Sequence, residues 1–208
     1  DVELISDELS LSRIINEASC ADRLAVDLES NGYFAYRARL CTAQLAWFAA
    51  DGTLRIAIVD TIALAPKLLA PLLEADRPLK VLHDLAYDAR LLFDSGVRLN
   101  SVRDTAVASV YLGNPATGLA SMLASELSVQ ISKEMRLSDW SLRPISEAQV
   151  GYLAGDVRYL LDLDRVLHEK VVALGIENEV ATETLYRIES AYSPEVDDRP
   201  LALRVKHS

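Results

Sequence analysis

The chain has 208 residues, 50% hydrophobic and 25% charged, which favours one compact α/β domain with a sizeable core. No stretch approaches 18 uninterrupted apolar residues and no signal peptide is visible, so the sequence predicts neither a membrane-spanning helix nor a membrane partner. The net charge of −10 excludes a broad basic face for nucleic acid. It still allows a small site where metal ions carry the positive charge. Cys20 and Cys41 lie far apart without metal-ligand spacing, which predicts two buried, free thiols in a reduced, cytoplasmic protein.

The first third of the chain predicts a helix followed by three strands. Residues 1–20 predict a short lead-in and a helix, capped by Ser10 or Ser12. Residues 24–29 alternate with the period of two that is typical of a strand. β-rich runs follow at residues 40–49 and 54–59. Because Asp51-Gly52 is a strong turn signal between them, they predict an antiparallel hairpin.

The middle of the chain alternates helical and short extended segments. The helical patterns cover residues 64–74, 84–93, 105–112 and 118–126. Short extended segments end at His83 and at Asp104, and Gly96 is expected to stop the helix before it.

The last third predicts the longest helix of the protein. Ser146 and Gln149 have the spacing of a capping box, and Gly175 is expected to end the helix. A further helix over residues 177–190 completes a domain that we place at residues 1–192. Residues 193–208 begin with a polar, proline-punctuated stretch, which predicts a linker or tail.

The first strand carries two acids on one face. Asp27 and Glu29 are two residues apart, so both carboxylates emerge on the same side, about 7 Å apart along the strand. Like charges on a central strand raise each other's pKa, and a shared cation removes that cost. Oxygen ligands alone suit Mg²⁺ or Mn²⁺. The alternative is a solvated strand edge with two surface acids.

Two further pairs have helical spacing. Tyr152 and Asp156 are four residues apart and share a helix face. Asp156 is a candidate metal ligand there, and the Tyr152 hydroxyl is a candidate to hydrogen-bond a nearby water. Asp84 and Asp88 have the same spacing at the start of another helix. Asp84 is well placed as a helix cap, with a role as a spare ligand as the alternative. Asp88 has less capping value and is a candidate metal ligand. His83 is either a site residue or a core-edge histidine.

Taken together, these motifs resemble the DEDDy branch of the 3′–5′ exonucleases, and within it the ribonuclease D group. The resemblance runs over about residues 24–163. It rests on Asp27-x-Glu29, on the segment from Lys80 through His83 to Asp88, and on Tyr152-x-x-x-Asp156. The intervening stretches also match: Asp104-Thr105, Leu112-Gly113, Gly118-Leu119-Ala120, Lys133, Ser138-Asp139-Trp140 and Arg143-Pro144. Tyr152 marks the DEDDy rather than the DEDDh branch. Asp84 is a departure from the family pattern.

The resemblance implies an α/β fold of the ribonuclease H type, with a mixed five-stranded sheet and helices on both faces. It also implies two Mg²⁺ or Mn²⁺ ions held by four carboxylates. Asp27 would bridge both ions, Glu29 and Asp156 would hold the ion on the nucleophile side, and Asp88 would act through the water shell of the other. Tyr152 would orient the attacking water. The expected activity is 3′–5′ hydrolysis of RNA, such as trimming of tRNA precursors, that releases nucleoside 5′-monophosphates.

Several other side chains are candidate substrate contacts. The candidates for phosphate are Arg37, Arg39, Lys133, Arg136 and Arg143, and His83 is a second-rank candidate. Trp140 is a candidate for stacking on a base. The alternatives are a buried Trp140 and an Arg143 that pairs with a neighbouring acid.

The tail and the substrate leave alternatives open. Residues 200–206 resemble the link that leads into the helical HRDC domains of full-length ribonuclease D proteins, so the chain is either an excised catalytic domain or a short, single-domain form. An exonuclease on single-stranded DNA or very short oligonucleotides is the first alternative function, because no residue is identified that reads a 2′-hydroxyl. A catalytically silent exonuclease-like fold that only binds nucleic acid is the second. The oligomeric state is left open.

Overall fold

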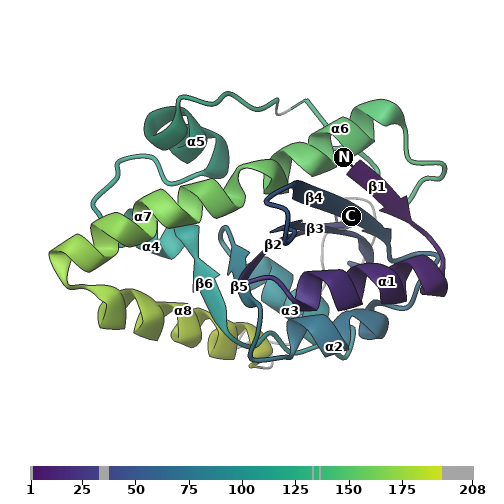
Figure 1. The fold of residues 1–208 in the computed structure, drawn as a ribbon, viewed down its shortest axis with the longest axis horizontal. Coiled ribbons are helices and arrows are strands. Elements are labelled where there is room, and N and C mark those ends of the chain that lie inside the picture. Colours follow the sequence, from purple (N-terminus) through teal and green to yellow (C-terminus); the bar gives the residue numbers. More distant parts are fainter. Residues whose placement is uncertain (1, 33–37, 133, 136, 194–208) are drawn as a thin grey trace, which may run out of the picture.

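The computed structural model describes residues 2–32, 38–132, 134–135 and 137–193 (Figure 1). Its centre is one mixed sheet with the strand order β1-β4-β3-β2-β5-β6. β3 runs antiparallel to β2 and β4, and the other neighbouring strands are parallel. The strands are β1 (Val2–Ile5), β2 (Arg23–Ser30), β3 (Leu40–Phe48), β4 (Leu54–Asp60), β5 (Leu79–Leu82) and β6 (Val102–Asp104).

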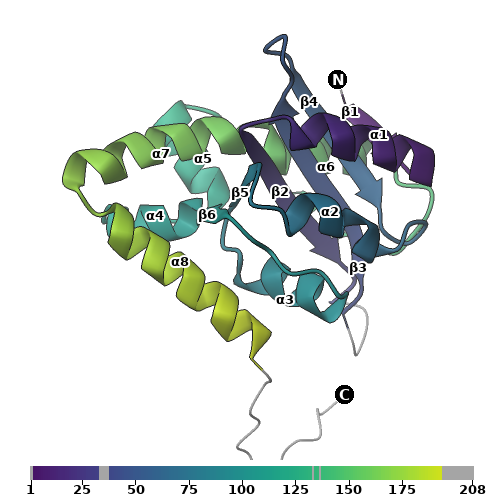
Figure 2. The same cartoon turned by 60° about the horizontal axis from the view of Figure 1, so that its bottom comes forward.

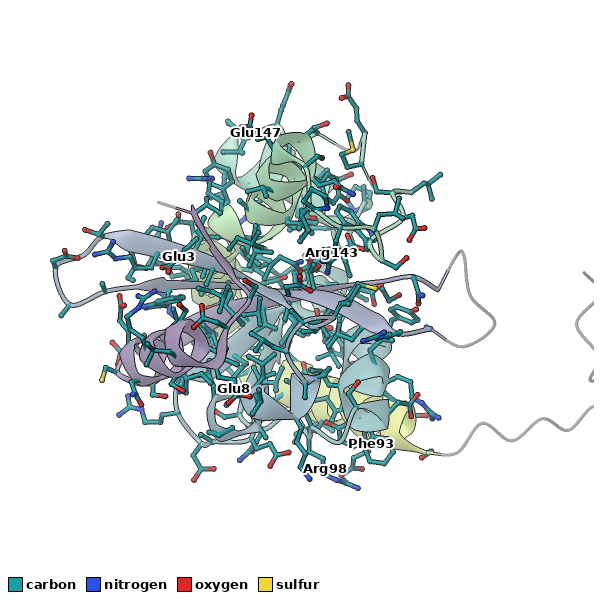
Figure 3. The ribbon with its side chains drawn as sticks, turned by 90° about the vertical axis from the view of Figure 1, so that its right-hand side faces the viewer. Glu3, Glu8, Phe93, Arg98, Arg143 and Glu147 are labelled. Carbon is teal, nitrogen blue, oxygen red and sulfur yellow. The ribbon has the colours of Figure 1, made fainter. Side chains whose placement is uncertain are left out.

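Helices cover both faces of the sheet. Figure 3 shows the sheet almost edge-on, with Glu147 of α6 on one side and Glu8 and Phe93 on the other. The buried side chains form two hydrophobic cores. One core holds side chains of α1 and α3, and the other holds side chains of α4, α6 and α7. The helices are α1 (Glu8–Ser19), the 3-10 helix η1 (Pro66–Leu69), α2 (Ala70–Leu73), α3 (Ala86–Asp94), α4 (Thr105–Tyr111), α5 (Leu119–Leu127), α6 (Glu147–Arg158), α7 (Leu160–Leu174) and α8 (Glu177–Tyr192). In Figure 2, α8 crosses the β6 end of the molecule, where it packs on α3 and α4.

The alternation predicted for the first strand is confirmed in β2. Leu24, Val26 and Leu28 are buried in the core beneath α1 and α3, whereas Ala25 belongs to the core of α6 and α7. Asp27 and Glu29 share the face of Ala25. β2 lies between β3 and β5, so its two acids stand at the centre of the sheet rather than at an edge.

The prediction of a five-stranded sheet is wrong by one strand, because the lead-in before α1 pairs with β4. Val2 to Ile5 run parallel to residues 56–59. Only Ile5 of this strand is buried, and its other three residues are exposed, so the segment lacks the apolar alternation that would have predicted a strand.

Three helix predictions need correction. Asp7, not Ser10 or Ser12, caps α1, and its carboxylate accepts the Ser10 N–H at 2.9 Å. Residues 64–74 form η1 and one α-helical turn instead of a regular helix, because Pro66 and Pro71 each remove an N–H donor. The Ser146–Gln149 capping box is confirmed, but the helix that it starts breaks at Tyr159, so α6 and α7 are separate and α8 is longer than either.

The cysteine prediction is half confirmed. Cys41 is buried and Cys20 is exposed, and both are free thiols. Cys20 follows the last turn of α1, where its side chain bonds the Asn16 carbonyl rather than entering the core. Within the part of the chain that the structure describes, no helix combines the length and apolar character needed to cross a bilayer.

Candidate active site

Three of the predicted carboxylates meet above the centre of the sheet. Ligand oxygens of Asp27, Glu29 and Asp156 all lie within 4.8 Å of one another. The first two come from β2, and Asp156 comes from α6, which packs across β2, β3 and β4. This places three oxygen donors from two distant segments close enough to share one cation.

Asp88 approaches the same place from α3, although it is not part of that group of three. Its side chain is only 8% exposed. Burial raises the pKa of Asp88 well above its ordinary value, and the charges of Asp27 and Glu29 raise it further. Asp88 therefore lies close enough to Asp27 and Glu29 for their charges to act on its carboxyl group.

The carboxylates are unfavourable as neighbouring anions. Burial raises the pKa of Asp27 from 3.8 to about 7. Burial also raises the pKa of Asp156 to about 8, with a further contribution from the charge of Asp27. A cation that binds these oxygens relieves this repulsion, and an all-oxygen donor set fits Mg²⁺ or Mn²⁺.

A buried amide lies on the same face as the acids. Gln44 of β3 pairs with Asp27, and Thr42 pairs with Glu29, so all four side chains project from one side of the sheet. Gln44 donates from Nε2 to Thr42 Oγ1 at 2.6 Å. Its Oε1 atom is buried and has no hydrogen-bond partner among the residues described. A free acceptor in this position also fits a site that takes in a hydrated cation.

Tyr152 stands one helical turn before Asp156. Its hydroxyl hydrogen-bonds to Asp156 and opposes the rise in the pKa of that carboxyl. The Tyr152 ring packs against Trp140, with the ring centroids 5.7 Å apart. The phenol is therefore held between an aromatic support and a candidate metal ligand, where its hydroxyl can orient a water.

Comparison with known proteins decides the family. A sequence profile described as 3′–5′ exonuclease matches residues 2–172. The chain belongs to the 3′–5′ exonuclease family. It is a domain of the ribonuclease D type. Ribonuclease D of Gluconacetobacter diazotrophicus is 32% identical over 189 residues, covering 88% of this chain and 46% of that protein. Exosome complex exonuclease RRP6 of Saccharomyces cerevisiae is 28% identical over 165 residues, covering 78% and 22%. The chain spans about half the length of the ribonuclease D relatives it matches.

Solved structures share the fold of this exonuclease domain. Escherichia coli RNase D superposes with a TM-score of 0.85 at 23% identity, over 93% of this chain and 51% of that one. Brucella melitensis NrnC with bound Mg²⁺ superposes with a TM-score of 0.75 at 24% identity, over 91% and 90%. The expected ribonuclease H-like, mixed α/β architecture is thereby confirmed.

Asp84 does not cap the helix that carries Asp88, contrary to the prediction. Its backbone lies in the left-handed region, with φ at 62°, and its exposed carboxylate points to Arg187 at 3.8 Å. The buried Asp104 instead holds the backbone of the two residues before α3. One Asp104 oxygen accepts the Asp84 N–H at 2.9 Å, and the other accepts the Leu85 N–H at 3.0 Å.

Asp104 also caps the next helix of the exonuclease domain. It accepts the Ala106 N–H at 2.8 Å and the Val107 N–H at 3.4 Å at the start of α4. One side chain at the end of β6 therefore fixes the two residues before α3 and the first turn of α4. Since α3 carries Asp88, Asp104 sets the position of a candidate ligand without belonging to the metal group.

Replacing Asp104 by Ala is expected to remove the α4 cap and the hydrogen bonds to the backbone before α3. At about 1 kcal/mol for the cap and about 1 kcal/mol for the other bonds, the loss is about 2 kcal/mol, which corresponds to a fall in Tm of about 6 °C for a domain of this size. Thermal denaturation and Mn²⁺ titration measure the two effects, and Mn²⁺ affinity should fall because Asp88 moves. Asp7→Ala is the matched control: it removes the single cap of α1 and should leave Mn²⁺ affinity unchanged. Equal Mn²⁺ affinity in both variants would refute the positioning role.

The predicted substrate contacts have mixed outcomes. Trp140 is 2% exposed in a cluster with Cys41, Ile58 and Leu153, so a role as an open platform for base stacking is contradicted. Arg143 uses its guanidinium on Asp60 and on three carbonyl oxygens, which contradicts a phosphate contact and agrees with the pairing alternative.

The remaining candidates stay predictions. His83 is partly buried, with Nδ1 2.9 Å from Thr105 Oγ1. Burial lowers the pKa of His83, although Asp104 and Asp84 oppose the change. Arg39 is exposed. Arg37, Lys133 and Arg136 lie outside the described residues.

Sequence reasoning missed Gln44, Thr42 and the capping role of Asp104. Gln44 and Thr42 were detectable in principle, because they are polar residues in an otherwise apolar run that must pair with the acidic strand. The double role of Asp104 had no local signal, since α3 and α4 belong to different segments of the chain.

Proposed function

We propose that this domain is a divalent-metal-dependent 3′–5′ exoribonuclease that removes nucleoside 5′-monophosphates from RNA 3′ ends, of the kind needed to trim tRNA precursors. The observation that carries the proposal is the convergence of Asp27, Glu29 and Asp156 within 4.8 Å, with Tyr152 bonded to Asp156. The similarity to proteins named Ribonuclease D supports RNA as the substrate. This similarity and the intact acids disfavour a catalytically silent fold that only binds.

The residues of the site divide the work of hydrolysis. Asp27, Glu29 and Asp156 would hold the ions, and Asp88 would act through water. Two divalent ions, Mg²⁺ or Mn²⁺, would supply an activated water and stabilise the leaving oxygen. Tyr152 orients the attacking water from its position beside Asp156. The water oxygen forms a bond to phosphorus, the bond from phosphorus to the 3′ oxygen breaks, and that oxygen leaves as a hydroxyl after taking up a proton.

The direct test is digestion of a 5′-labelled single-stranded RNA of about 20 nucleotides with Mg²⁺, Mn²⁺ or EDTA. The expected result is a ladder that shortens one nucleotide at a time, with nucleoside 5′-monophosphates as the released product and no cleavage in EDTA. Internal cuts, or nucleoside 3′-phosphates, would contradict the proposal. Absence of both cleavage and divalent-ion binding would favour the silent binding fold.

A second candidate, cleavage of very short oligonucleotides, is supported by one comparison. Brucella melitensis NrnC bound to pGG superposes with a TM-score of 0.73 at 26% identity. The net charge of −10 agrees, because it disfavours long phosphate backbones outside the site. Rates on dinucleotides and 20-mers of matched RNA and DNA separate the candidates. An RNA 20-mer cleaved fastest supports the first, and a dinucleotide of either sugar cleaved fastest supports the second.

Several further expectations stay predictions alongside this function. They are weak binding of long duplexes with a modest salt dependence, and location in the cytoplasm.

A further inference from the structure

The guanidinium of Arg143 donates to five acceptor oxygens, which lie on the sheet and on the segment before α6. Nε and one terminal nitrogen donate to the two carboxylate oxygens of Asp60, at 2.7 and 2.6 Å. The same terminal nitrogen donates to the Cys41 carbonyl at 2.9 Å. The other donates to the carbonyls of Trp140 and Leu142, at 2.8 and 2.7 Å. All five N–H groups of an arginine are thus used.

Asp60 is held as firmly as the arginine. It ends β4 and also accepts the backbone N–H groups of Ile62 and Ala63. Burial alone would raise the pKa of Asp60, but the hydrogen bonds from Arg143 and these N–H groups hold it below its ordinary value. The carboxylate therefore stays ionised, and the bidentate pair resists displacement.

This ion pair fixes the segment that precedes α6 to the sheet. Arg143 lies beside the sheet on the α6 side in Figure 3, and its Cys41 bond adds a contact to β3. Because the arginine also binds the Trp140 carbonyl, the position of Trp140 follows from the same set of bonds. We call Arg143, Asp60 and Trp140 the α6 clamp.

The Trp140 ring connects the clamp to the active site. It is 2% exposed and packs on the Tyr152 ring at 5.7 Å, with the ring planes at 30°. Leu153, the residue after Tyr152, belongs to the same apolar cluster. Tyr152 hydrogen-bonds to Asp156 at its other end. The phenol thus has one support in the apolar cluster and one in the carboxylate group.

We propose that Trp140, held by the Arg143–Asp60 pair, is a positioning residue that fixes the Tyr152 ring for hydrolysis. The inference rests on the proposed function. It assigns a role to two side chains that the sequence suggested as substrate contacts. Misplacement of a reacting group by 1 Å can cost a factor of about 100 in rate, so loosening the ring should lower kcat without changing which ions are bound.

The test is a double-mutant cycle on RNA cleavage. Trp140→Leu alone is expected to lower kcat roughly tenfold, with KM and the Mn²⁺ binding midpoint unchanged within about twofold. Tyr152→Phe alone lowers kcat because the hydroxyl is lost. The double variant should be no slower than Tyr152→Phe, since a ring without its hydroxyl has nothing left to position. Trp140→Phe keeps an aromatic support and should restore most of the rate.

Two further variants keep the test decisive. Trp47→Leu removes another tryptophan that is 2% exposed, in the opposite core. Trp47→Leu should lower Tm as Trp140→Leu does, but it should have only a small effect on kcat. In combination with Tyr152→Phe, the two fold-changes in kcat should multiply, as expected for independent sites. If Trp140→Leu does not fold, Arg143→Lys replaces it in the cycle, because lysine keeps the charge but cannot bind five acceptors.

The outcomes separate the clamp from the proposed function. The positioning role of Trp140 is overturned if the fold-changes in kcat from Trp140→Leu and Tyr152→Phe multiply in the double variant. It is also overturned if kcat is unchanged in Trp140→Leu. If Tyr152→Phe itself cleaves RNA at the full rate, the role of Tyr152 in the proposed function fails as well.

Discussion

The Asp27→Asn variant is expected to lose at least about 10³-fold in kcat on single-stranded RNA while remaining folded. Ions in such sites stabilise the transition state by several kcal/mol, and each 1.4 kcal/mol is tenfold in rate. Asp27 is the acid whose charge reaches both Asp88 and Asp156, so its loss would weaken the binding of any ion that the group holds. Asn keeps the shape and one oxygen but removes the negative charge.

Asp22→Asn is the matched control for this variant. Asp22 lies just before β2, its side chain is 92% exposed, and it makes only a loose ion pair with Arg77. It should cleave RNA at the rate of the unmodified protein. The comparison uses initial rates at saturating Mn²⁺, with circular dichroism as a check on folding. An Asp27→Asn protein that retains more than a tenth of the activity would show that the carboxylate group is not the catalytic site.

The metal-free protein is expected to lose stability as the pH rises from about 4 to 8. Burial raises the pKa of Asp27 to about 7, and that of Asp156 to about 8, from 3.8. A group whose pKa is raised by folding stabilises the protein while it is protonated, and that stability is lost as the pH passes through the folded pKa. For Asp27 the rise corresponds to about 4 kcal/mol, or about 10 °C in Tm.

Divalent ions should reverse this loss, because a ligand that binds only the folded state stabilises it. Thermal denaturation at pH 4.5 and pH 9, in EDTA and in Mn²⁺, measures both effects. Asp27→Asn should raise the Tm of the metal-free protein at pH 9 and reduce the gain from Mn²⁺. The same Tm in EDTA at both pH values would contradict the raised pKa values. A Tm that falls with pH equally in Asp27→Asn would assign the effect to other groups.

Local patterns in the sequence were sufficient for several elements. The alternation of residues 24–29 placed Asp27 and Glu29 on one face of β2, and the Ser146–Gln149 capping box marked the start of α6 correctly. Both depend on interactions between residues a few positions apart. β1 and the break at Tyr159 did not have such a signal, because β1 depends on pairing with β4 and neither Pro nor Gly stands at the break.

The candidate site shows the same division. The spacing of Tyr152 and Asp156 was enough to put them on one helix face, but only the resemblance grouped them with the acids of β2. Asp84 is a residue type that caps helices, but its own N–H is bound by Asp104, which is 20 positions away in the chain. Trp140 and Arg143 were suggested as substrate contacts. The sequence could not reveal their partners, Tyr152 and Asp60, because these come from other elements.

The carboxylates of the site come from β2, α3 and α6, which together span most of the chain. During synthesis, Asp27 and Glu29 leave the ribosome long before Asp156. A nascent chain that has folded only its sheet therefore has two ligands and no complete group of three. The complete group of three can therefore form only after α6 has been synthesised and has packed on the sheet.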